Sequence, residues 1–125
     1  MVVGSAETGN ALTFSLANQT PFGLAVLLVL AHFVCDFSLQ SDRMAREKYP
    51  GHDSTLPWGW WLTAHASTHG LAVALLTGLP LLGLLETIAH ALIDWAKGRW
   101  HWSMGCDQIL HLGCKLGWLV LLLHG

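Results

Sequence analysis

Four hydrophobic stretches of this chain each carry two candidate metal ligands spaced four residues apart. The pairs are His32 and Asp36, His65 and His69, His90 and Asp94, and Asp107 and His111. A spacing of four places both side chains on the same face of an α-helix. Imidazole and carboxylate groups that gather from several helices are typical of sites for divalent metal ions. One such pair would be a weak signal, but four pairs in four stretches indicate a common cluster.

The stretches that carry these pairs are long enough to cross a bilayer, which takes about 20 residues. They cover residues 20–40, 58–78, 79–98 and 104–124, and the second and third are joined by a tight turn. Hydrophobic residues make up 53% of the chain and charged residues 11%, whereas a soluble domain carries about 25% charge. We therefore predict an all-α polytopic membrane protein, a four-transmembrane-helix bundle over residues 20–125 that follows an N-terminal polar segment over residues 1–19.

Positive charges indicate the orientation of this bundle. Arg43, Arg46 and Lys48 lie between the first two stretches, and Lys97 and Arg99 lie between the last two. The positive-inside rule places both loops in the cytoplasm, so both termini are expected on the outer, periplasmic side.

Residues 1–10 contain no Lys or Arg, which argues against a signal peptide. With a net charge of -2 and no basic face, the chain is not expected to bind nucleic acid.

In an antiparallel bundle the members of the four pairs fall at two depths, about 6 Å apart along the helices. One member of each pair lies nearer the cytoplasm, and these members form a shallow layer of three carboxylates and one imidazole. The other members form a deeper layer of four imidazoles. The shallow layer is Asp36, His65, Asp94 and Asp107, and the deep layer is His32, His69, His90 and His111.

Carboxylates inside a membrane are costly unless a partner neutralises them, and one or two divalent ions would do so. Imidazole with carboxylate favours zinc, with iron, manganese or nickel as alternatives. Some of the eight residues would then be outer-shell partners of the ligands. Two other interpretations stay open: a hydrogen-bonded polar network or proton path without metal, and haem ligation, which would leave the aspartates unexplained.

Further polar and small residues extend the prediction. Glu86 and Lys115 fall at equal depth beyond the cluster, so we expect them to pair, either as a structural ion pair or as a catalytic base or proton relay. Lys97 and Arg99 follow Asp94 and could bind an anionic substrate group, although anchoring at the cytoplasmic side is the simpler interpretation. Homodimerisation through a GxxxG motif is a further option, at Gly113 and Gly117.

Several of these motifs resemble a family of small bacterial inner-membrane proteins that is catalogued as a domain of unknown function. The resemblance covers about residues 31–111 and is carried by AHFVCDFSLQSDRMAREK, the HxxxH of His65 and His69, HALIDWAKGR and DQILH. It implies a helical protein of the bacterial inner membrane and no particular activity. The His/Asp pattern is more loosely similar to membrane-bound metal-dependent hydrolases.

Together these observations favour a metal-dependent hydrolase that acts on a lipid-linked substrate. The metal would generate a nucleophilic water, and the substrate would enter sideways from the inner leaflet. The alternatives are a metal-ion or proton transporter or channel, which would need an oligomer, and a structural metal site in a membrane scaffold. A di-iron redox enzyme is disfavoured because glutamates are scarce at the site.

Overall fold

All secondary structure over residues 19–125, which the computed structural model describes, is helical. In chain order the elements are α2 (Pro21–Phe33), the π-helix η1 (Val34–Ser38), α3 (Asp42–Glu47), α4 (Trp58–Thr77), α5 (Pro80–Trp100) and α6 (Met104–His124). When η1 is counted with α2, the long helices agree with the four predicted stretches to within about two residues. The predicted N-terminal polar segment lies outside the described residues except for Gln19.

Residues with strong terminal preferences set the ends of these helices. Thr20 precedes α2, and its hydroxyl accepts a hydrogen bond of 3.0 Å from the backbone N–H of Gly23. The hydroxyl of Ser103 caps α6 in the same way. Gly78 ends α4 with a φ of 73°, a left-handed conformation that favours glycine, and α5 begins at Pro80. This short connection makes α4 and α5 an antiparallel hairpin, as predicted.

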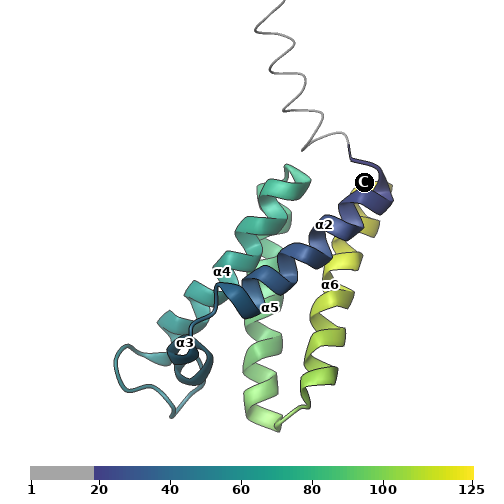
Figure 1. Ribbon diagram of the computed structural model, residues 1–125. Coiled ribbons are helices and arrows are strands. Elements are labelled where there is room, and N and C mark those ends of the chain that lie inside the picture. The colour runs from purple at the N-terminus through teal and green to yellow at the C-terminus, as the bar shows by residue number, and fades with distance from the viewer. Residues whose placement is uncertain (1–18) are drawn as a thin grey trace, which may run out of the picture.

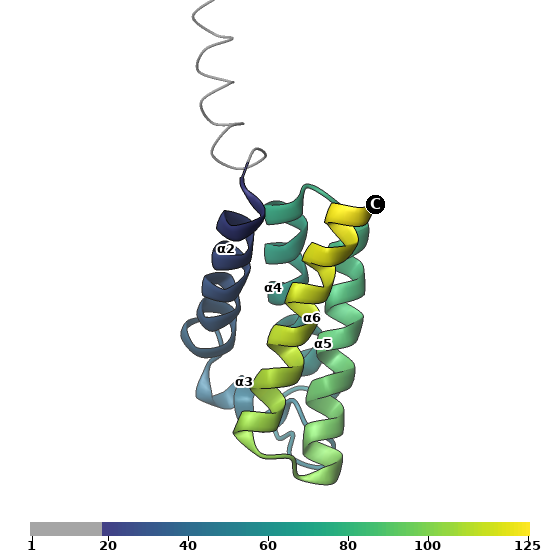
Figure 2. The same ribbon diagram turned by 90° about the vertical axis from the view of Figure 1, so that its right-hand side faces the viewer.

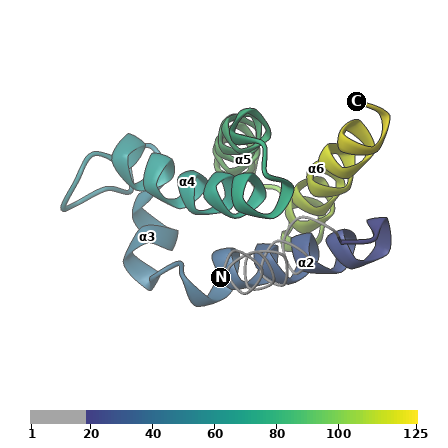
Figure 3. The same ribbon diagram turned by 90° about the horizontal axis from the view of Figure 1, so that it is seen from above.

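The long helices run side by side, with α3 and the following loop at one end and the C-terminus at the other (Figures 1 and 2). Helix α2 contacts α4 and α6, while α5 contacts the same two helices from the opposite side (Figure 3). Every long helix therefore borders a common interior. This arrangement turns one face of each helix toward the others, and the candidate ligands lie on those faces.

The α4–α5 hairpin is the most closely packed pair because two glycines face each other across it. A Cβ atom added to Gly70 would lie 1.8 Å from Thr87 Oγ1 and 2.5 Å from the backbone oxygen of Gly83. Neither approach is tolerable, and the second involves backbone that cannot rotate away. Glycine at these positions therefore permits the short interhelical distance, which in turn brings His65 and His69 of α4 against α5.

We expect Gly70→Ala to lower the free energy of unfolding by about 1–3 kcal/mol, the usual range for overpacking a close contact. The matched control is Gly59→Ala in the same helix, where an added Cβ meets nothing within 4 Å. Unfolding in mixed detergent micelles, followed by circular dichroism, measures both variants. Equal stability of the two variants would show that this close approach is unimportant.

Apolar side chains cover the outside of the long helices, whereas charged and polar side chains fill much of the interior. The buried set includes three aspartates, two glutamates, two lysines and five histidines, an inversion of the usual distribution in soluble proteins. Two helical segments are long and apolar enough to cross a membrane, Pro21–Ser38 and Met104–His124. Helices α4 and α5 have similar lengths but include more polar residues, so the four-span topology stays a prediction.

Two local features differ from the sequence prediction. The first stretch is not a uniform α-helix to residue 40, since its last turn is the π-helix η1, which ends at Ser38. Single π-turns are frequent at functional sites, and this one contains Asp36. The predicted loop after it contains the short helix α3, whose first turn is capped by Ser41. Helix α3 returns the chain toward the interior and brings Lys48 to the cluster.

Candidate metal centre

Five imidazoles from all four long helices meet in the interior, and each is at most 1% exposed. The rings of His69 and His90 are stacked with centroids 3.7 Å apart, and those of His90 and His111 with centroids 3.9 Å apart. The ring of His32 lies 5.3 Å from that of His69 and 5.7 Å from that of His111. The predicted deep layer consists of His32, His69, His90 and His111, and their rings do lie together.

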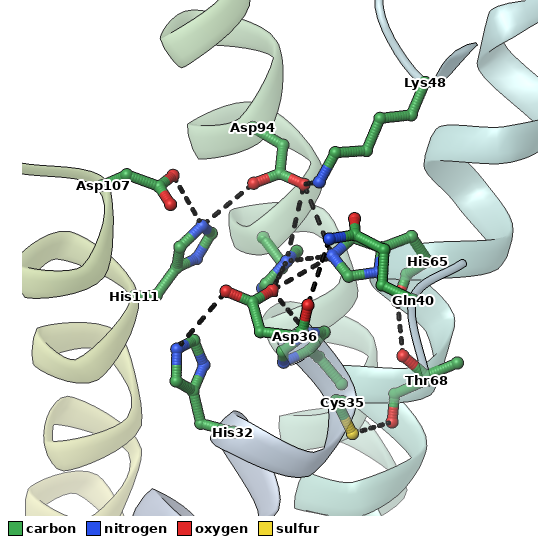
Figure 4. A network of polar contacts seen from close by, with 12 residues as sticks. His32, Cys35, Asp36, Gln40, Lys48, His65, Thr68, Asp94, Asp107 and His111 are labelled. Atoms are coloured by element: carbon green, nitrogen blue, oxygen red, sulfur yellow. Dashed lines mark hydrogen bonds and ion pairs between the residues drawn. The ribbon is translucent and has the colours of Figure 1, made fainter. Parts of the chain in front are cut away.

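The three aspartates lie against these rings. Asp36 Oδ1 is 3.2 Å from Nε2 of both His65 and His69. His111 Nε2 lies between Asp94 and Asp107, 3.0 Å from one carboxylate and 3.1 Å from the other (Figure 4). The structure thus brings all eight predicted ligands together in a single network. The two predicted layers touch directly through these contacts, and the ligand roles of the eight residues stay predictions.

Two groups within this network have the geometry to hold a metal ion. The first is Asp36, His65, His69 and His90, and the second is His90, Asp94 and His111. Within each group, one potential ligand atom per residue lies within 4.8 Å of all the others, and every member is buried. His90 belongs to both groups, while His32 and Asp107 belong to neither. These buried groups could therefore hold one ion, or two neighbouring ions that compete for His90.

Lysines neutralise all but one of the buried carboxylates around the centre. Lys48 Nζ lies 2.5 Å from Asp94 Oδ2, and Lys97 Nζ lies 3.3 Å from Asp107 Oδ2. Asp36 has no ion pair with Lys or Arg within residues 19–125. Its partners are imidazoles and the amide of Gln108, which donates a 2.7 Å hydrogen bond to Asp36 Oδ2. Because a buried carboxylate without a countercharge is costly, a further positive charge next to Asp36 would stabilise it, whether from a cation or from protonation of a neighbouring imidazole.

The Nε2 atom of His69 also indicates that a positive charge would fit next to Asp36. Its Nε2 atom is buried and lies 3.2 Å from Asp36 Oδ1, yet it makes no hydrogen bond. Buried polar atoms are nearly always satisfied. A cation between this nitrogen and the Asp36 carboxylate would satisfy both atoms, so the donor set of the first group fits a divalent metal.

The predicted pairing of Glu86 with Lys115 is confirmed. Lys115 Nζ donates a 2.5 Å hydrogen bond to Glu86 Oε1, and the indole N–H of Trp118 donates to the other carboxylate oxygen at 2.5 Å. The pair lies behind the imidazoles, since Lys115 Nζ is 3.3 Å from His69 Nδ1 and Glu86 Oε1 is 3.5 Å from His90 Nδ1. It therefore contacts the rings on the side away from the aspartates.

Sequence reasoning missed two residues of the network. Lys48 was interpreted as a basic loop residue, but α3 carries it inward, where it is 5% exposed and pairs with Asp94. Gln108 follows Asp107 in α6 and was not among the predicted ligands. Its amide bridges two helices: Oε1 accepts a hydrogen bond from His32 Nε2 at 2.8 Å, and Nε2 donates to Asp36. Its position next to Asp107 in DQxxH was the available signal.

A carboxylate outside the long helices holds the loop that carries Lys48. Glu47 accepts hydrogen bonds from the backbone N–H of Ser54 at 2.8 Å, from the Ser54 hydroxyl and from the Thr55 hydroxyl at 2.6 Å. These donors lower the pKa of Glu47 to about 2. Burial and the neighbouring aspartates raise the pKa of the Tyr49 phenol, so this hydroxyl stays protonated. The loop is thus tied back onto α3, beside the centre.

Lys97 and Arg99 lie at the end of α5, outside the ligand groups. Both line a cavity of about 450 Å³ between this end of α5 and the loop after α3. Lys97 also pairs with Asp107, whereas Arg99 is exposed and does not contact the cluster. The three histidines outside the ligand pairs, His52, His101 and His124, are exposed.

Comparison with known proteins places the chain in a family. Residues 24–121, most of the chain and all of the centre, match the family described as "Protein of unknown function (DUF3307)". The chain belongs to the DUF3307 family. Among curated proteins and among solved structures, nothing matches this DUF3307 member. The family match confirms the predicted resemblance to an uncharacterised family and does not extend to the looser resemblance to hydrolases.

Proposed function

We propose that this DUF3307 protein spans the bacterial inner membrane with all four long helices. Large apolar side chains are exposed on each of these helices, among them Leu30, Leu75, Leu84 and Val120. Such a continuous apolar exterior around a charged interior suits lipid rather than water. The carboxylates and imidazoles of α4 and α5 face the interior, where a membrane-spanning helix keeps its ionisable groups.

The cytoplasmic end in this proposal is the end that carries α3. Five of the six Lys and Arg residues belong to this end, and the sixth is the buried Lys115. The positive-inside rule then places α3 in the cytoplasm and both termini in the periplasm. The centre lies in the cytoplasmic half of the membrane, within reach of the inner leaflet.

The metal in this proposal is one divalent ion, bound by Asp36, His65, His69 and His90. The observation that carries it is Asp36, the carboxylate around the centre without a Lys or Arg partner in the described part of the chain. Imidazoles with one carboxylate favour zinc, with iron, manganese or nickel as alternatives. An ion in the second group would compete with Lys48 for Asp94, so the first group is the preferred position.

The reaction we propose is hydrolysis of a lipid-linked ester or phosphate. A divalent ion at this position would make a bound water acidic enough to supply hydroxide near neutral pH. The water oxygen forms a bond to phosphorus or acyl carbon, the bond to the lipid-side oxygen breaks, and a proton ends on that oxygen. His111, held between Asp94 and Asp107, is placed to carry this proton. Lys97 and Arg99 are placed to hold an anionic substrate group.

The test is turnover by the purified, metal-loaded protein in detergent. Phosphatidic acid, a polyprenyl phosphate and a lipid ester are offered with Zn²⁺, Mn²⁺, Fe²⁺ or Ni²⁺, and released phosphate or acid is measured. We expect turnover with one substrate class and a loss of at least about 100-fold in Asp36→Asn. Metal bound at full occupancy without any turnover would contradict the hydrolase.

A structural metal is the second candidate, because the four residues of the first group would by themselves complete a tetrahedral shell. In that case the variant Asp36→Asn lowers stability, while no substrate is turned over by the wild type.

Transport through a single chain is less favoured, since the apolar cluster that includes Leu28, Val73 and Leu82 fills the interior beyond the Glu86–Lys115 pair. Homodimerisation through Gly113 and Gly117, where an added Cβ meets nothing, stays a prediction.

A further inference from the structure

A cavity separate from the ligand groups opens beside the centre at the α3 end of the molecule. It measures about 450 Å³, a size that suits a head group or other small ligand. One wall is the end of α5, with Trp95, Lys97 and Arg99, and the other is the loop after α3, with Tyr49 and His52. Trp102, which precedes α6, also lines the cavity. Segments from two distant parts of the chain thus border it.

The charge of this cavity points to an anionic ligand. Arg99 makes no ion pair or hydrogen bond with any residue in the range 19–125, so its guanidinium is available. Lys97 adds a second cation, shared with Asp107 at 3.3 Å. Tyr49 and His52 bring further polar groups to the opposite wall. Guanidinium groups bind phosphate through two parallel hydrogen bonds.

Aromatic walls distinguish this cavity from a site for free phosphate. Trp95 and Trp102 line it, and the neighbouring Trp100 is 57% exposed, with its ring centroid 5.9 Å from that of Trp95 and 5.7 Å from that of Trp102. Tryptophans gather where a protein meets lipid head groups. A ligand that contacts these rings while its anion binds Arg99 has both an apolar and a phosphate part.

The cavity also adjoins the centre through residues that pair with its aspartates or neighbour such residues in sequence. Lys97 lines the cavity and pairs with Asp107, while Tyr49 lines it directly after Lys48, which pairs with Asp94. Tyr49 packs against Gly98, where an added Cβ would lie 2.3 Å from the tyrosine ring. A bound phosphate would therefore lie next to the two aspartates that contact His111.

We propose that this cavity binds the phosphate group of a membrane lipid, with Arg99 as its main ligand. This inference deepens the proposed hydrolase and rests on its membrane location, because it names the substrate as a phosphorylated lipid. Lys97 assists by turning from Asp107 toward the phosphate. Trp95 and Trp102 contact the part of the lipid next to the phosphate.

Lipid binding to the full chain in nanodiscs tests the proposal. The discs contain phosphatidylcholine alone or with a minor fraction of phosphatidic acid, and native mass spectrometry measures the retained lipid. We expect selective retention of phosphatidic acid and about a tenfold loss in Arg99→Gln, the size of one lost charge-assisted contact. The matched control is Arg46→Gln, which removes the same charge at the same end of the molecule but outside this cavity, and it should retain the lipid.

Three outcomes would overturn the lipid site: no selectivity for phosphatidic acid, equal losses in Arg99→Gln and Arg46→Gln, or displacement of the lipid by inorganic phosphate at similar concentration.

The same measurement on Asp36→Asn separates this inference from the proposed reaction. Selective retention by Asp36→Asn supports the lipid site independently of the metal. Retention by the wild type without turnover would contradict only the hydrolase, and turnover of a lipid ester unaffected by Arg99→Gln would contradict only the phosphate site.

Discussion

Glu86→Gln is expected to lower the free energy of unfolding by about 3–5 kcal/mol, the usual result of removing one partner from a buried ion pair. The change leaves the ammonium of Lys115 buried at 1% exposure, without its 2.5 Å partner. It also leaves the indole N–H of Trp118 with a weaker acceptor. Unfolding in mixed micelles with increasing SDS measures the loss.

The double variant Glu86→Gln with Lys115→Met separates a structural pair from a catalytic one. Because it removes both charges, it should recover most of the stability that the single variant loses. If the pair is structural, the recovered protein also keeps its metal and any hydrolytic activity. Recovered stability without activity would instead support the predicted catalytic roles of Glu86 and Lys115. A stable Glu86→Gln protein would contradict a buried ion pair here.

His90→Asn is expected to weaken metal binding more than about 100-fold, beyond what the loss of an outer-shell partner produces. The large effect is expected because His90 belongs to both candidate ligand groups. His32→Asn is the matched control, because His32 is equally buried but belongs to neither group. Its Nε2 contacts Gln108 at 2.8 Å and Asp36 at 3.6 Å, so its loss should weaken binding by about tenfold.

Competition with a chromophoric zinc chelator in detergent measures both affinities. Circular dichroism of each apo-protein controls for folding, since both substitutions remove a buried ring of the same size. Equal affinities of the two variants would mean that the ligand groups have been wrongly chosen. A stronger effect of His32→Asn would indicate that the ion lies closer to α2 and Gln108 than proposed.

Much of the fold follows from local sequence signals. Long apolar stretches fix the four long helices, and Thr20, Gly78, Pro80 and Ser103 mark their ends with caps and turns whose geometry is local. The spacing of four residues within each ligand pair fixes a helix face regardless of the neighbours. The convergence of the aspartates and histidines could therefore be predicted before any helix was placed, and so could the contact of Glu86 with Lys115.

The remainder depends on contacts between distant segments. The π-turn that contains Asp36 was not predicted, because no pattern in the sequence distinguishes it from the α-helix before it. Lys48 resembles any basic loop residue, and only the return of the chain through α3 turns it toward Asp94. Neutralisation of the aspartates by lysines was invisible for the same reason. It also bears on the proposed metal position, since Asp36 is left without a Lys or Arg partner in the described residues.

The most direct test of the metal centre is elemental analysis of the untagged protein, purified without chelators and compared with Asp36→Asn prepared in the same way. We predict about one divalent ion per wild-type chain, zinc before iron, manganese or nickel, and a small fraction of that in the variant. Wild-type protein that is folded and carries no more metal than Asp36→Asn would contradict the metal centre and favour a hydrogen-bonded polar network.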